Sequence, residues 1–206
     1  MWWKNMEREL ATIVNVMTHM LGTYADSSAS IAPTAVLKGD VTVGAGTKIC
    51  HGAFLQGPIS IGKNCLIGNN AMLRGPLKIG DNVRIGFAAE LKGAVLRDNC
   101  SIGPQCFVAD SLLEEKVYLG AQVRTSNHRL DYRTIHSAAA GGLVDTGREK
   151  LGAFIGADAR LGIQCITLPG RIIAPDSVFG PRITVEKNLP AGTYMLKQVI
   201  VNTSCS

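Results

Sequence analysis

The sequence predicts an all-β solenoid, a parallel β-helix with an N-terminal helix and one protruding loop. The first observation is a run of aliphatic side chains that recur every six residues from Ile31 to Leu91. A second run, four residues further along each hexad, is small or apolar from Ala35 to Val95. An α-helix or an ordinary strand does not produce a period of six, whereas a short strand plus a turn does, and three such units close one triangular coil. Both runs are therefore expected to point inward.

Glycine follows the first aliphatic position in many hexads, among them Gly62, Gly86 and Gly103. Because glycine tolerates backbone dihedrals that strain other residues, we expect these glycines to form tight corners. The hexad phase resumes after one deletion at Leu96 and, after an interruption, at Ile155. We therefore assign the β-helix to residues 29–182, with a loop inserted at residues 125–150.

The two ends of the chain flank this solenoid. Residues 1–28 are predicted to form a helical cap, because apolar side chains lie there at helical spacing: Trp3, Met6, Leu10, Ile13, Met17, Met20 and Leu21. Residues 183–206 are predicted to form a C-terminal tail. Two glutamates interrupt the apolar stretch near the start, which argues against a signal peptide, and no run approaches the length of a membrane span. The expected location is cytoplasmic, with no membrane partner.

Composition narrows the function further. The net charge of +5 is modest and no basic run carries interleaved aromatic residues, so nucleic acid is not an expected partner. None of the 6 cysteines forms a Cys-x-x-Cys pair. Four of them occupy the small inward position, as reduced core residues would: Cys65, Cys100, Cys106 and Cys165.

The hexads resemble the left-handed β-helix of the hexapeptide-repeat proteins over roughly residues 31–182. A narrower resemblance rests on residues 144–171, VDTGREKLGAFIGADARLGIQCITLPGR, and on the Thr-x-Asn-His-Arg segment at 125–129. These segments are similar to the C-terminal domain of archaeal-type sugar-phosphate nucleotidylyltransferases. The resemblance implies a homotrimeric, cytoplasmic acyltransferase. Its donor would be acetyl-CoA, used as co-substrate, and its acceptor an amino-sugar phosphate or nucleotide sugar.

The resemblance also implies site residues. Arg74 and Lys92 match the cations that contact the sugar phosphate or uridylyl group, Glu90 belongs to the Glu-x-Lys pair, and Asn127 matches the asparagine of the loop. Arg74 and Lys92 lie 18 residues apart, one coil in a three-hexad solenoid, and should share a face. An ordinary solvated surface would show the same two cations.

The positions that correspond to the family's general-base histidine and its substrate-binding tyrosine hold Pro104 and Phe107. Proline has no titratable group, so another residue must take the proton or the reaction is not performed. His128 is the candidate base, because histidine titrates near neutral pH and this one lies in the inserted loop. A solvated loop histidine is the alternative. Arg148 and Lys150 are candidates for contacting the phosphates of CoA, although a charged loop end explains them equally well.

Two other functions compete with acyl transfer. A sugar-nucleotide-binding or scaffolding trimer that has lost the base is consistent with Pro104 and Phe107. A zinc enzyme of the γ-carbonic-anhydrase type needs two histidines about five residues apart on one coil, but His128 and His136 are eight apart within a loop, so no metal is expected. No glycine-rich nucleotide loop precedes residue 31, so a separate nucleotidylyltransferase is a candidate partner.

Overall fold

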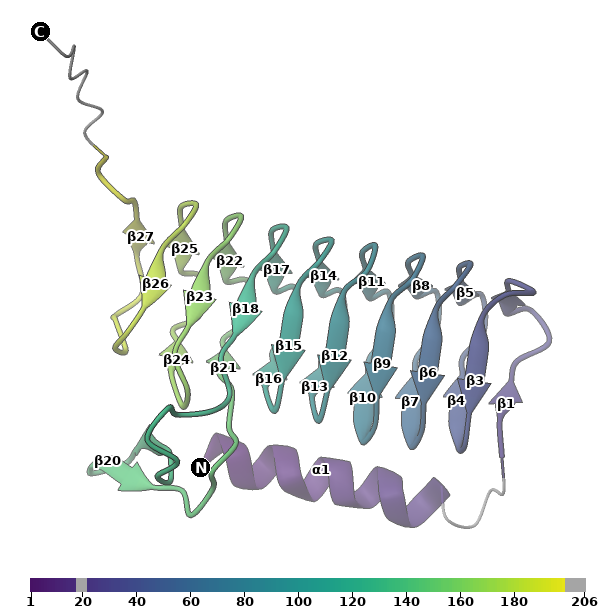
Figure 1. The fold of residues 1–206 in the computed structure, drawn as a ribbon, viewed down its shortest axis with the longest axis horizontal. Helices are drawn as coiled ribbons and strands as arrows, with labels where there is room; N and C mark the ends of the chain where they lie inside the picture. Colours follow the sequence, from purple (N-terminus) through teal and green to yellow (C-terminus); the bar gives the residue numbers. More distant parts are fainter. Residues whose placement is uncertain (18–21, 199–206) are drawn as a thin grey trace, which may run out of the picture.

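The computed structural model describes residues 1–17 and 22–198, and it shows the solenoid that the hexads predict (Figure 1). Parallel sheets form its three faces, and successive strands pass from one face to the next. Helix α1 (Trp2–Met17) lies along one side of the solenoid. Met20 and Leu21, which were expected on this helix, lie outside the described residues. No helix in the described ranges is long and apolar enough to cross a bilayer.

Sheet A, the face under α1, contains β1 (Tyr24–Ala25), β4 (Val41–Val43), β7 (Ile59–Ile61), β10 (Leu77–Ile79), β13 (Val95–Leu96), β16 (Leu112–Leu113), β21 (Phe154–Ile155) and β24 (Ile172–Ile173). Sheet B contains β2 (Ser30–Ile31), β5 (Lys48–Ile49), β8 (Leu66–Ile67), β11 (Arg84–Ile85), β14 (Ser101–Ile102), β17 (Tyr118–Leu119), β22 (Arg160–Leu161), β25 (Val178–Phe179) and β27 (Thr193–Tyr194). Sheet C contains β3 (Val36–Lys38), β6 (Phe54–Gln56), β9 (Met72–Arg74), β12 (Glu90–Lys92), β15 (Phe107–Ala109), β18 (Arg124–Thr125), β23 (Ile166–Thr167) and β26 (Thr184–Val185). The inserted loop leaves after β18 and carries the antiparallel hairpin β19 (His136–Ala139) and β20 (Gly142–Asp145).

The aliphatic side chains of the first hexad position fill the interior, as predicted. Ile67, Ile85 and Leu91 are at most 1% exposed and belong to one continuous core. The first coil is the exception, with Ile31 37% exposed and Leu37 only partly buried. The reason is that α1 covers a side of the solenoid and not its end, so the first strand of sheet B has no coil beyond it. Strand pairing also extends outside residues 29–182, from β1 at one end to β27 at the other.

The prediction that Val95 points inward is wrong. Val95 pairs with Lys78, an outward residue, whereas Leu96 pairs with the inward Ile79. The deletion shortens the corner after Lys92 by one residue, and a slip of one residue moves a side chain to the opposite face of a strand. Ala94 therefore takes the inward place. Val95 instead starts an outward apolar row that continues through Leu112, Phe154 and Ile172, on which the N-terminal half of α1 packs.

The glycines after the first hexad position are required for space, not for their backbone dihedrals. Gly62, Gly86 and Gly103 do not have a positive φ; the left-handed residues lie two positions later in the corner, as at Asn64 and Gln105. A Cβ atom added to Gly103 would lie 2.6 Å from the carbonyl carbon of Gly120 in the next coil. Stacked coils therefore leave no room for a side chain at this position.

Four cysteines occupy the inward positions that the sequence predicts, and all four are buried free thiols. Each Sγ–H donates to a carbonyl oxygen in a corner of the next coil, at 3.0 Å from Cys106 to Gly120 and at 3.1 Å from Cys100 to Glu114. Burial raises the pKa of Cys100 to about 12 and that of Cys106 to about 11. Both side chains therefore remain neutral thiols at physiological pH, consistent with a role in the core.

Glu9 joins the middle of α1 to sheet A through two basic residues. Its carboxylate accepts hydrogen bonds from Arg97 at 2.6 and 2.8 Å and from Lys78 at 3.0 Å. Burial raises the pKa of Glu9, but the hydrogen bonds and charges of Arg97 and Lys78 outweigh burial, so the net pKa lies below its ordinary value. The ion pair therefore stabilises the folded state when Glu9 is ionised.

We expect Glu9→Gln to lower the free energy of unfolding by about 1–2 kcal/mol at pH 7, because the pair is only partly buried. A depressed carboxylate pKa contributes stability above the unfolded-state pKa and loses it as pH falls through the folded-state pKa. The difference between wild type and variant should therefore shrink as pH falls below the ordinary glutamate pKa of about 4.3 and vanish below the lowered folded-state pKa of Glu9. Denaturant unfolding at several pH values measures it, with Glu149→Gln on the exposed loop as the control. A difference that does not shrink between pH 7 and acidic pH would contradict this account.

Candidate functional site

A groove of about 360 Å³ runs along the corner between sheets C and A. Register places Gln56, Arg74 and Lys92 in one row at the ends of β6, β9 and β12, as the spacing of 18 residues predicts. The groove is lined by these three residues, by the glycines and proline of the corners, and by Asp110. The β-helix thus aligns equivalent side chains from neighbouring coils along one edge.

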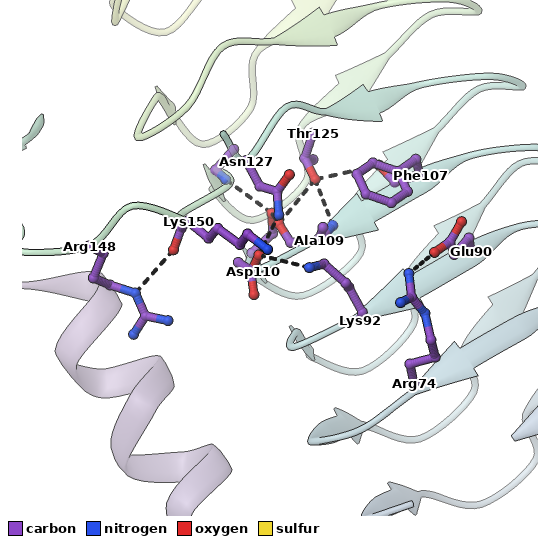
Figure 2. A network of polar contacts seen from close by, with 12 residues as sticks. Arg74, Glu90, Lys92, Phe107, Ala109, Asp110, Thr125, Asn127, Arg148 and Lys150 are labelled. Atoms are coloured by element: carbon purple, nitrogen blue, oxygen red, sulfur yellow. Dashed lines mark hydrogen bonds and ion pairs between the residues drawn. The ribbon is translucent and has the colours of Figure 1, made fainter. Parts of the chain in front are cut away.

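The two predicted cations of the groove each face a carboxylate (Figure 2). Arg74 forms an ion pair with Glu90 on the adjacent strand. Lys92 Nζ lies 3.7 Å from Asp110 Oδ2. The side-chain amide of Asn127 donates to the same Asp110 oxygen at 2.5 Å. The structure therefore brings Arg74, Glu90, Lys92 and Asn127 together, but as a cluster of alternating charges and not as a bare anion site.

Asp110 is a residue of this groove that sequence analysis missed. It follows β15 and adopts a left-handed conformation with φ 47° at the corner. The neighbouring Ala109 N–H donates to Thr125 Oγ1 at 2.9 Å, and the Gly152 N–H donates to the Asp110 carbonyl oxygen at 2.8 Å. These bonds fix the corner from the next coil. The sequence contained one signal for Asp110: an acidic residue follows the Arg74 and Lys92 corners at a distance of one coil.

His128 lies at the base of the inserted loop and faces a second hollow. This pocket, of about 570 Å³, is formed between the loop and the corner at Leu168–Pro169, and His128 and His136 both line it. The His128 ring meets the Tyr132 ring edge to face at a centroid distance of 5.2 Å. Within one chain, His128 therefore lines a different hollow from the groove to which Asn127 and Asp110 belong.

Arg148 and Lys150 lie where the loop returns to the solenoid. Lys150 forms an isolated antiparallel bridge with His128, so the two chain segments at the loop base lie side by side. Arg148 Nε donates to the Lys150 carbonyl oxygen at 3.1 Å, and its guanidinium forms an ion pair with Glu7 of α1. Arg148 thus connects the loop base to the helix.

Pro104 and Phe107, at the positions implied for a histidine and a tyrosine, lie near the corner between sheets B and C. The Pro104 carbonyl oxygen accepts the Gln122 N–H at 2.9 Å. Phe107 lines a hollow of about 600 Å³ with Glu90 and Arg124. The two substituted side chains offer no group to accept a proton here.

Comparisons with known proteins also identify the hexapeptide repeat. The family model of bacterial transferase hexapeptide repeats (six repeats) matches residues 58–93. The LpxA structure, a UDP-N-acetylglucosamine acyltransferase from Bacteroides fragilis, superposes with a TM-score of 0.54 over 82% of this chain and 67% of that chain, at 12% identity. This likeness concerns the fold alone, which is the left-handed β-helix.

Sequence relatives extend over more of the chain. The uncharacterized acetyltransferase YaiX of Escherichia coli strain 536 is 47% identical over 210 residues, which cover 98% of this chain and 90% of the relative. The YaiX protein of strain K12, named a putative uncharacterized acetyltransferase, matches over the same shares at 47% identity. A bifunctional sugar-1-phosphate nucleotidylyltransferase/acetyltransferase from Sulfurisphaera tokodaii is 32% identical over 49% of this chain and 25% of that protein. The chain therefore belongs to the hexapeptide-repeat transferase family, among the acetyltransferases related to YaiX.

Proposed function

We propose that this protein transfers an acetyl group from acetyl-CoA to an amino or hydroxyl group of an amino-sugar phosphate or nucleotide sugar. The observation that carries the proposal is the groove lined by Arg74, Lys92 and Asp110, in which Arg74 is paired with Glu90 of the adjacent strand and Lys92 with Asp110. Family membership supports acyl transfer, and the groove supports the class of acceptor.

The charges of the groove suit an acceptor that bears both signs. Cationic side chains bind phosphate through charge-assisted hydrogen bonds, and carboxylates accept hydrogen bonds from sugar hydroxyl or ammonium groups. Because Arg74 and Lys92 are each opposed by a carboxylate, a simple anion gains little there. An amino-sugar phosphate satisfies both kinds of group, and the amide of Asn127 holds the Asp110 carboxylate in position.

The reaction needs a base, which we assign to His128. The acceptor nitrogen or oxygen attacks the thioester carbonyl carbon while His128 takes the proton from it. The carbon–sulfur bond then breaks, and the protonated His128 returns the proton to the sulfur, so that CoA leaves as the thiol. Backbone N–H groups along the coils are candidates to stabilise the developing oxyanion. Arg148 and Lys150 at the loop base are proposed to contact the CoA phosphates; Arg148 would exchange its contact with Glu7 for a phosphate.

We further propose a homotrimer in which the loop of one subunit completes the groove of its neighbour. In one chain, His128 lines the pocket beside the loop, whereas Asn127, its neighbour in sequence, donates to Asp110 of the groove. A shared reaction site therefore requires His128 from a second subunit, which a cyclic assembly supplies to every groove equivalently. A cytoplasmic location and a separate nucleotidylyltransferase partner remain part of the proposal.

A thiol-release assay with acetyl-CoA tests the proposed function. The acceptors are a panel of amino-sugar 1-phosphates and nucleotide-linked amino sugars, offered to wild type and to Lys92→Met. We expect turnover with wild type and a rise in acceptor KM of roughly 10–100-fold in the variant, because a hydrogen bond to a charged group is lost. Lys48→Met, an exposed lysine on sheet B, is the control and should behave as wild type.

The alternative is a sugar-nucleotide-binding or scaffolding trimer without activity, which Pro104 and Phe107 favour. The same experiment separates the two. Absence of turnover with every acceptor, together with acceptor binding that Lys92→Met weakens, would reject acyl transfer and support the binding protein.

A further inference from the structure

The hollow beside the inserted loop differs in charge from the groove of Arg74 and Lys92. It is lined by Arg171 and Arg129, by His128 and His136, and by an apolar wall that includes Ile135, Leu168 and Pro169. Arg129 is neutralised inside the pocket, because its guanidinium donates to both carboxylate oxygens of Asp131 at 2.8 and 2.5 Å. His136 lies opposite Asp145 in the register of the hairpin.

Arg171 is the cation without a counter-ion. Its Nε donates to the Pro169 carbonyl oxygen at 3.2 Å. Throughout residues 1–17 and 22–198, no carboxylate lies within 4.0 Å of its guanidinium. Burial, together with the charge of Arg129, lowers the pKa of Arg171, which shows that the positive charge is disfavoured in the free protein. An anionic ligand would remove this penalty.

The backbone that carries Arg171 is held in place by long-range contacts. Trp2 Nε1 donates to Ser137 Oγ at 3.0 Å, and Ser137 Oγ donates to the Gly170 carbonyl oxygen at 2.8 Å. Gly170 has φ +73° in this corner. Helix, hairpin and solenoid thus fix the corner next to Arg171, whereas Leu130 on the loop side of the pocket is 97% exposed. A fixed cation beside an apolar wall is suited to binding a charged group that carries an apolar or planar neighbour.

We propose that this pocket binds a phosphate-bearing group of one of the two substrates, with Arg171 as the phosphate contact. The ligand class rests on the proposed function, but the binding does not require turnover. The phosphate comes either from the nucleotide end of the acyl donor or from the phosphorylated acceptor, and both offer a phosphate attached to a ring that the apolar wall can contact.

Isothermal titration calorimetry with three separate probes tests the site: acetyl-CoA, glucosamine 1-phosphate and inorganic pyrophosphate. Each is titrated into wild type, Arg171→Gln and Arg160→Gln; Arg160 is an exposed arginine on sheet B and serves as the matched control. We expect Arg171→Gln to weaken at least one probe about tenfold or more, while the control binds as wild type does. Circular dichroism establishes that both variants are folded.

The pattern of loss identifies the source of the phosphate. Weakened acetyl-CoA assigns the pocket to the donor, weakened glucosamine 1-phosphate assigns it to the acceptor, and weakened pyrophosphate alone keeps the anion site even if the transfer assay has failed. The inference is overturned if wild type and Arg171→Gln are indistinguishable with all three probes, whether all bind equally or none binds. Partial recovery in Arg171→Lys would support a direct phosphate contact, because the positive charge is retained.

Discussion

Replacing Trp3 with alanine is expected to lower the free energy of unfolding by about 3–5 kcal/mol, the usual cost of removing a buried indole. Trp3 is 1% exposed and belongs to a buried cluster that also contains Val95 and Leu112 of sheet A and Leu151 at the return of the loop. Its ring also meets that of Trp2 edge to face at a centroid distance of 5.9 Å. The cluster thus joins the helix, the solenoid and the inserted loop, and truncation of Trp3 leaves a cavity within it.

Denaturant unfolding followed by far-ultraviolet circular dichroism measures this loss at a fixed protein concentration, because oligomerisation affects apparent stability. Lys4→Ala, an exposed change on the same helix, is the control and should lie within about 0.5 kcal/mol of wild type. A loss below about 1 kcal/mol for Trp3→Ala would show that the helix contributes little to the fold.

The hexads were sufficient to predict the coils, because a period of six repeated over most of the chain fits one architecture, a solenoid with three short strands in each coil. The same regularity misplaced Val95. A deletion is visible in the spacing between Leu91 and Leu96, but the sequence does not show which corner residue is missing. The structure shows that the corner itself is shortened, and the resulting slip creates the outward apolar row on which α1 packs. Glycine at Gly103 was correctly placed in a corner, but for the wrong physical reason.

The groove was predictable only in part. Arg74 and Lys92 share a row because each coil has nearly the same length, which follows from the repeat alone. Their carboxylate partners depend on side-chain geometry. The repeat places Asp110 one coil beyond the Arg74 and Lys92 corners, but it does not show that the Asp110 carboxylate faces Lys92. The direction of His128 depends on the loop conformation, which is fixed by contacts with Lys150 and the helix and not by any period.

The proposed base gives the largest expected effect on activity. His128→Ala should lower kcat by about 10²–10⁴, the usual contribution of general-base catalysis, with acceptor affinity little changed. The matched variant is Asp110→Asn, which removes the charge next to Lys92 and should mainly raise acceptor KM. The thiol-release assay at saturating and limiting acceptor separates the two effects. If Asp110→Asn loses kcat and His128→Ala does not, the base lies in the groove and the assignment of His128 is wrong.

Mixed oligomers test whether His128 and the groove come from different subunits. Two differently tagged chains, His128→Ala and Lys92→Met, are co-expressed, and the assemblies that carry both tags are isolated. If each site combines two neighbouring subunits of a cyclic trimer, about one third of the sites in the isolated mixed trimers are restored, because each mixed trimer contains one site that pairs an intact groove with an intact His128. The same two variants, purified separately and then combined, provide the control and should show no recovery. Activity is measured at limiting acceptor, where both variants are slow. Mixed assemblies no more active than this control would reject the shared site. A monomer by light scattering would also reject it, because both groups would then belong to one chain.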